Sequence, residues 1–133
     1  MDFTLKKYRK LCSSLKSFGY NFYGIRDFIL GNVKDPFVIM RHDVDRSPKK
    51  ALIMAQIEND LGISSTFNFR TVSKKLFDVD RMKKIESLGH EIAYHYEVLV
   101  KSGGDYGLAI KFFEEDLAMF RKNSFEIKTA TFH

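Results

Sequence analysis

The chain has one cysteine, two prolines and no tryptophan among its 133 residues. With Cys12 as its single thiol it cannot form an internal disulfide, which fits a reducing compartment. No apolar run is long enough to cross a bilayer, and the residues after Met1 lack the apolar core of a secretion signal. We therefore expect a cytoplasmic protein without a membrane partner.

Long runs of charge are also missing. The formal net charge is +5, but the basic residues occur mostly as isolated pairs such as Lys49-Lys50 and Lys74-Lys75. Such pairs are typical of solvated helix faces, and no platform of aromatic and basic residues accompanies them. The pattern predicts no nucleic-acid partner, and the excess of positive charge would favour anionic substrates.

The length and the 44% hydrophobic content are those of one globular domain. Apolar residues at helical spacing predict an N-terminal helix over 5–18, which Gly19 would end. A short strand or turn and a short helix follow over 20–30. We therefore expect an N-terminal helical segment at 1–32 that packs on an α/β domain at 33–133.

From residue 37 onward, strand and helix patterns alternate along the chain. The predicted strands cover 37–41, 63–69, 91–96 and 127–132, and the predicted helices cover 48–61, 79–88 and 106–122. Strands separated by helices of this length imply right-handed βαβ units and a parallel sheet.

Polar side chains follow the ends of these strands, most clearly in Arg41-His42-Asp43-Val44-Asp45. Residues two apart in a strand project to the same side, so Asp43 and Asp45 would face one point. In parallel α/β folds, ligands bind at the carboxyl ends of the strands. The other strands bring to this edge Asn68, Arg70, His95, Glu97 and His133. We expect a site there, although an Asp-x-Asp pair can also serve only as a turn and helix cap.

Three segments resemble motifs of the polysaccharide deacetylases, the NodB-homology or carbohydrate esterase family four enzymes. The stretch 41–45 resembles the first motif, in which an aspartate pair supplies a base and a metal ligand. Residues 61–69 are similar to the family's G-x-x-A-T-F-F strand. Residues 88–95 resemble its G-H-E-I-G-x-H segment, whose last histidine binds metal. The three occur in the family's order, and the resemblance covers roughly 33–133.

The resemblance implies a fold and a reaction. The fold is about the first half of a distorted (β/α)7 barrel, because the family's later strands have no counterpart here. The reaction is metal-dependent hydrolysis of the N-acetyl group of a sugar or polysaccharide. Asp43 would be the base, and Asp45 and His95 would be metal ligands. Zinc suits these donors best, and cobalt, nickel or manganese would also fit.

The chain also departs from the family. A second histidine usually follows the metal histidine four residues later, and Leu99 occupies that position. A third ligand would then come from His42, Glu97, His133 or residues outside this sequence, and Arg70 is a further candidate for substrate contact. His90, just before its strand, would be structural.

Two other interpretations use the same residues. Haloacid-dehalogenase-type phosphatases also place Asp-x-Asp after a first strand, with Mg²⁺, but normally have apolar residues where this chain has Arg41-His42. Alternatively, the chain is catalytically silent, or is one half of a split barrel that needs a partner chain. Its open sheet edges would then favour self-association or pairing with a complementing chain.

Overall fold

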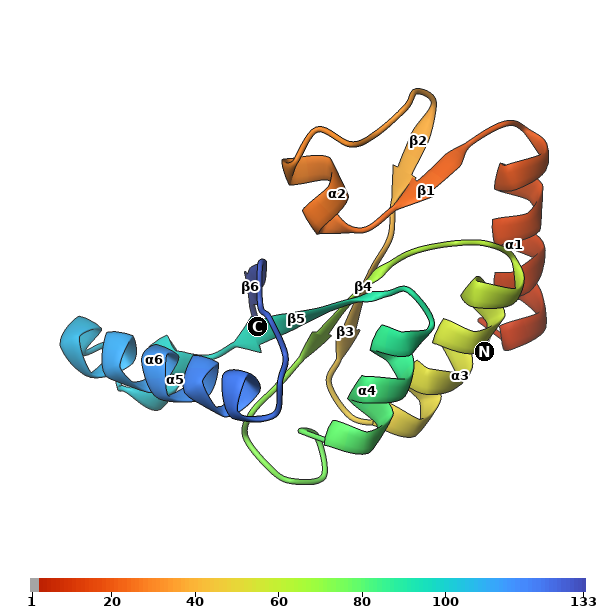
Figure 1. Ribbon diagram of the computed structural model, residues 1–133. Helices are drawn as coiled ribbons and strands as arrows, with labels where there is room; N and C mark the ends of the chain where they lie inside the picture. Colours follow the sequence, from red (N-terminus) through yellow and green to blue (C-terminus); the bar gives the residue numbers. More distant parts are fainter. Residues whose placement is uncertain (1–2) are drawn as a thin grey trace.

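The computed structural model describes residues 3–133 and shows an α/β protein with parallel strands (Figure 1). Four strands form a curled half-barrel sheet in the order β3-β4-β5-β6, and β1 and β2 form a separate pair. The strands are β1 Asn21–Tyr23, β2 Phe37–Ile39, β3 Arg41–Val44, β4 Thr66–Phe69, β5 Glu91–Tyr96 and β6 Ala130–Phe132. The helices are α1 Leu5–Ser17, α2 Ile25–Ile29, α3 Pro48–Asp60, α4 Val79–Ser87, α5 Val98–Lys101 and α6 Tyr106–Lys122.

The helices begin where the sequence places capping residues. Ser47 accepts a hydrogen bond from the Lys50 amide at the start of α3, and Asp78 does the same for α4. Gly62, just after α3, has a φ of +68°, which glycine adopts readily. Only the short helix α5 was not predicted. Within residues 3–133, no helix is both long and apolar enough to span a bilayer.

The first predicted strand is two strands in the structure. It is interrupted at Met40, whose amide donates to the Tyr23 carbonyl at 2.8 Å and whose carbonyl accepts from the Thr66 amide at 3.0 Å. Residues before Met40 pair with β1, and residues after it pair with β4. The N-terminal segment therefore contributes a strand as well as helices, and the β1-β2 pair bridges the expected boundary at residue 33.

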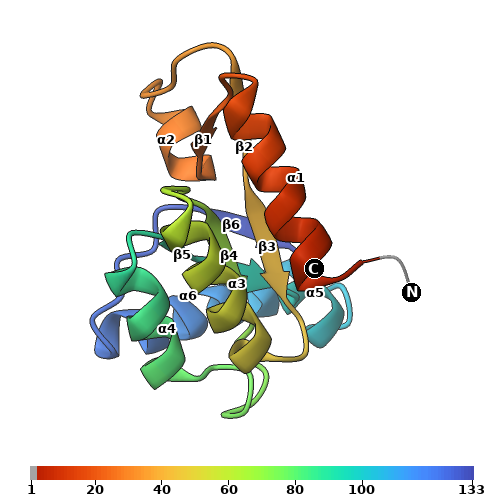
Figure 2. The same cartoon turned by 90° about the vertical axis from the view of Figure 1, so that its right-hand side faces the viewer.

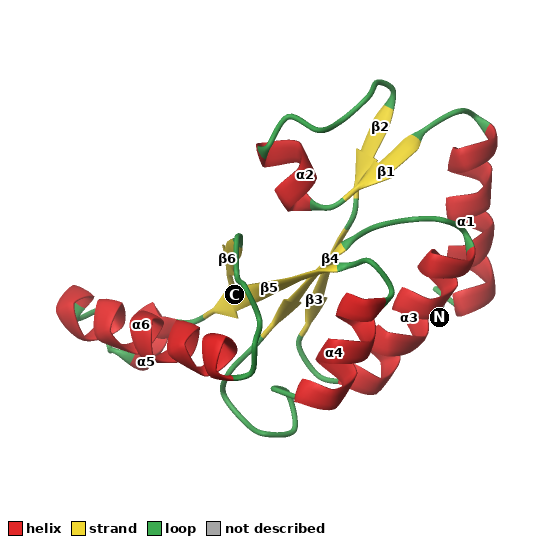
Figure 3. Ribbon diagram, viewed as in Figure 1, coloured by secondary structure: helices red, strands yellow, loops and turns green. Residues whose placement is uncertain are grey.

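The two faces of the four-stranded sheet differ in polarity. One face is apolar and packs against α3, α4 and α6, which lie outside the curled sheet (Figure 3). Its buried residues are Val44, Phe67, Phe69, Ile92 and Tyr94. The register places Asp43 beside Asn68 on the opposite face, which is polar. This second face is the one that carries the predicted site residues.

Helix α2 covers the amino-terminal part of the polar face. The Ile25 amide donates to Thr66 Oγ1 at 2.8 Å, and the Arg26 amide donates to Glu91 Oε2 at 3.1 Å. A Cβ on Gly24 would lie 2.7 Å from Thr66 Oγ1, so this close approach requires glycine. The buried Glu91 carboxylate also accepts a bond from Thr129 Oγ1 at 2.6 Å. The amino-terminal end of the polar face is therefore covered by α2.

Helix α1 packs against α3 (Figures 1 and 2), and a buried polar cluster lies at this contact. Its centre is Glu58, which is fully buried and accepts hydrogen bonds from Tyr8 Oη and, at 2.5 Å, from Ser65 Oγ. His42 Nε2 lies 2.5 Å from the same carboxylate. Burial raises the pKa of Glu58, but the contacts with His42, Ser65 and Tyr8 lower it by a larger amount. The pKa of Glu58 therefore lies below its ordinary value.

Candidate active site

Three potential metal donors meet at the carboxyl end of the sheet. Asp45 follows β3, His95 lies in β5 and His133 follows β6. Asp45 Oδ1 lies 3.4 Å from His95 Nε2 and 3.3 Å from His133 Nε2, and all three donor atoms lie within 4.8 Å of one another. Bonds of about 2.0–2.1 Å to a tetrahedral ion place its donors about 3.3–3.4 Å apart. The two measured separations match that spacing.

Unsatisfied polar atoms gather at the same edge. Among residues 3–133, the buried side-chain atoms without a hydrogen-bond partner are Asp45 Oδ1, Asn68 Oδ1 and Arg70 Nε. A buried carboxylate oxygen without a donor is costly, and a bound cation removes that cost. The unpaired oxygen of Asp45 is the one that faces the two imidazoles, so these residues fit a metal ion.

Each histidine has an acceptor behind it. His95 Nδ1 lies 3.2 Å from the Thr131 carbonyl; an N–H donated there leaves the lone pair of Nε2 facing Asp45. His133 Nδ1 faces Glu97 Oε2 at 3.6 Å, and Arg70 Nη2 donates to that same oxygen at 2.6 Å. Glu97 and Arg70 therefore lie behind His133, where they can orient it.

Asp43 lies beside the three donors and is held by two side chains. Arg41 donates to both of its oxygens, at 2.9 and 2.7 Å, and Asn68 Nδ2 donates to Oδ1 at 2.9 Å. Its Oδ2 lies 3.9 Å from His95 Nε2. Burial raises the pKa of Asp43, but the bonds from Arg41 and Asn68 lower it by a larger amount. The pKa of Asp43 therefore lies below its usual value. The carboxylate is ionised at neutral pH.

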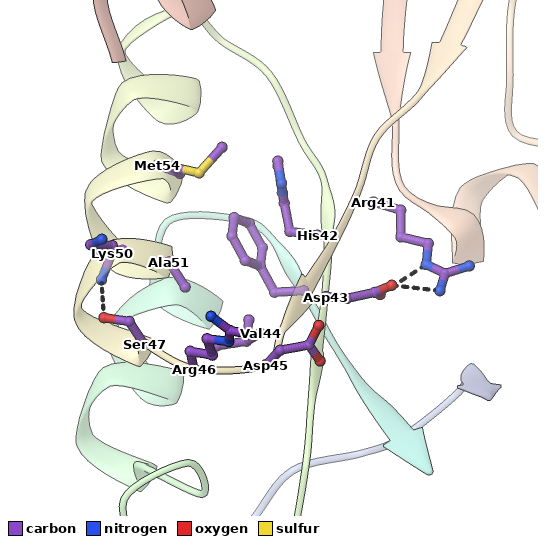
Figure 4. A pocket seen from close by; sticks show the side chains of 11 residues that line it. Arg41, His42, Asp43, Val44, Asp45, Arg46, Ser47, Lys50, Ala51 and Met54 are labelled. Carbon is purple, nitrogen blue, oxygen red and sulfur yellow. Dashed lines mark hydrogen bonds and ion pairs between the residues drawn. The ribbon is translucent and has the colours of Figure 1, made fainter. Parts of the chain in front are cut away.

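The remaining candidate histidines lie elsewhere. Figure 4 shows His42 on the other side of β3 from Asp43 and Asp45, where it contacts Glu58. His90 is buried, with Nε2 2.9 Å from the Ala55 carbonyl, and it is structural as predicted. Neither histidine reaches the three donors.

Helix capping does not explain the aspartate pair. The cap of α3 is Ser47, and the Asp45 amide donates to the Asp43 carbonyl at 3.1 Å in a turn. Both carboxylates project toward the polar face of the sheet (Figure 4). Their side chains are therefore available for chemistry.

Sequence reasoning missed two supporting residues. It did not identify the Thr131 carbonyl behind His95 or the two hydrogen bonds that Arg41 donates to Asp43. Alternation along β3 gave a usable signal for Arg41, which precedes Asp43 by two residues and contacts it in the structure. It gave none for Thr131, because the group behind His95 is a backbone carbonyl and alternation describes side chains.

A hollow of about 620 Å³ adjoins Asp43 and Asp45 along the edge of β3 (Figure 4). A smaller one, of about 410 Å³, adjoins His133. Substrate could thus approach from either side. In comparisons with known proteins, the chain matches no family model, no curated protein and no solved structure.

Proposed function

We propose that this protein is a metal-dependent hydrolase that removes the acetyl group from an N-acetylated sugar, as carbohydrate N-deacetylases do. The observation that carries the proposal is the meeting of Asp45, His95 and His133 beside the ionised Asp43. His133 would supply the ligand that Leu99 cannot. A divalent cation at these donors would polarise the acetamide carbonyl and lower the pKa of a water molecule. The single cysteine favours a cytoplasmic setting.

Asp43 is suited to act as the general base. Its Oδ2 accepts one bond from Arg41 and lies 3.9 Å from His95 Nε2, so it can accept a further hydrogen bond, from a water molecule. The water oxygen would attack the carbonyl carbon while its proton moves to Asp43. The C–N bond then breaks and the proton passes from Asp43 to the departing amine. Acetic acid and the amine leave, and at neutral pH they ionise to acetate and an ammonium group.

The donor set favours zinc over magnesium. Two imidazoles and one carboxylate suit zinc, with cobalt, nickel or manganese as substitutes, whereas Mg²⁺ prefers oxygen donors. A haloacid-dehalogenase-type phosphatase would need Mg²⁺ and Asp43 as nucleophile. The two imidazoles among the donors therefore favour the deacetylase over the phosphatase.

Acetate release from N-acetylglucosamine oligosaccharides tests this proposal. With zinc present, we expect the parent protein to release acetate and to leave p-nitrophenyl phosphate with Mg²⁺ intact. Asp43→Asn should lower the rate about a hundredfold, because it removes the proton acceptor, while zinc content stays unchanged. Asp60→Asn, an exposed carboxylate paired with Arg9, is the control. Phosphate release without acetate release would refute the proposal.

Open sheet edges favour a second candidate, a half-barrel that pairs with another chain. Within the part of the chain that the structure describes, β3 and β6 each pair on one side only, and Phe132 in β6 is 51% exposed. Unpaired edges invite strand addition. We expect concentration-dependent self-association, measured by light scattering. A stable monomer at all concentrations would count against this candidate.

A further inference from the structure

The larger hollow combines an apolar floor with a charged rim. Val44, Ala51 and Phe67 line it and are buried, and Asp43 and Asp45 border it. A concave apolar surface with a few polar groups is the usual form of a small-molecule site. The hollow lies between β3 and α3, and Asp43 and Asp45 on its border separate it from the two histidine donors, so it provides space for a part of the substrate that extends around the edge of β3.

Two cations on this rim lack acidic partners. Arg46 follows Asp45, and Lys50 lies in the first turn of α3; both line the hollow (Figure 4). Neither side chain makes a hydrogen bond or ion pair with any residue in 3–133. Arg41, on the same rim, is by contrast neutralised by Asp43.

The charge around the hollow is therefore unbalanced. Arg41 and Asp43 cancel. The single negative charge of Asp45, even without a bound cation, does not balance the two positive charges of Arg46 and Lys50. Exposed lysines are usually only solvated, as Lys49 is, but Lys49 does not line the hollow. Like charges that border one concave surface attract a ligand of opposite charge.

We propose that the hollow binds an anionic group, a phosphate or a carboxylate, that is carried by the N-acetylated sugar. Arg46 and Lys50 bind the anion, and the apolar floor contacts the sugar ring. This inference rests on the proposed function, because it names the substrate class of that site. The preferred substrate is then an acidic amino sugar, and a neutral one, such as an N-acetylglucosamine oligosaccharide, binds more weakly.

Calorimetric titration with glucose and glucose 6-phosphate tests the inference. These probes differ only in the anion and carry no acetamide. The protein is treated with chelator and kept at low salt, so that phosphate cannot bind through a metal ion. We expect roughly tenfold tighter binding of the sugar phosphate, since two ion pairs form, and a smaller difference at high salt. In the double variant Arg46→Gln/Lys50→Gln, the ratio of the affinity for glucose 6-phosphate to the affinity for glucose should fall to about one.

Lys49→Gln is the matched control, because it removes the same charge from the adjacent position. It should keep the tenfold ratio. Equal binding of the two probes by the parent protein, or an unchanged ratio in the double variant, would overturn the inference. Inorganic phosphate that binds as tightly as glucose 6-phosphate would also overturn it, because the sugar would then contribute nothing. None of these titrations requires metal or turnover, so their outcome is separate from that of the deacetylase assay.

Discussion

Zinc binding is expected to be lost when Asp45, His95 or His133 is replaced by alanine. Complete four-ligand zinc sites bind with about 10–16 kcal/mol, or roughly 3 kcal/mol for each donor, which corresponds to more than a hundredfold in affinity. Asp45 lies at tetrahedral spacing from both His95 and His133, and all three donor atoms lie within 4.8 Å of one another, so each removal should have this effect. The measurement is elemental analysis of protein purified without chelator, followed by competition with a chelator for affinity.

Two variants serve as references for this result. Glu97→Gln keeps all three donors and changes only the group behind His133, so we expect a loss of about tenfold. Asp60→Ala removes an exposed carboxylate at the end of α3 and should leave the zinc content and affinity unchanged. Equal zinc content in the parent and in the three alanine variants would eliminate the proposed site.

Glu58→Ala is expected to lower the free energy of unfolding by about 3–5 kcal/mol. The fully buried carboxylate accepts bonds from Tyr8 and Ser65 and lies against His42. Without it, these polar groups stay buried without their partner, and α1 loses its polar contact with α3. Urea unfolding followed by circular dichroism gives the difference.

The pH dependence of stability separates charge from packing at this position. Because the pKa of Glu58 is lowered in the folded protein, its contribution is complete above the ordinary value of 4.5 and is lost as pH falls below that value. Glu58→Gln should remove this part of the acid sensitivity. Glu114→Ala, at an exposed helix position, should cost less than about 0.5 kcal/mol. If Glu58→Ala lowers the free energy of unfolding by no more than Glu114→Ala does, the buried polar cluster does not stabilise the fold.

The helices could be predicted because their signals are local. Ser47 and Asp78 mark two helix starts, and Gly62 follows a helix end, where their chemistry requires them. The break at Met40 could not be predicted in this way. It depends on bonds to Tyr23 and Thr66, which are distant in sequence, while the apolar run through Met40 resembles one continuous strand.

The site was predictable to the extent that it follows from strand alternation. Asp43, Asp45 and His95 share a face of the sheet, as expected. The same rule could have excluded His42 as a metal ligand, because it is one residue from Asp43 and so projects to the other face. Choosing His133 over Glu97 as the third donor was beyond the sequence, because the choice depends on the register of β6 against β5.

The shortness of β6 has a consequence for motion at this edge. Three residues pair it with β5, so its local opening should cost far less than global unfolding. An ion that joins His133 to Asp45 and His95 would fasten the end of β6 to two other strands. By mass action, binding would then slow hydrogen exchange of the β6 amides, and the looser the strand is without the ion, the larger that change.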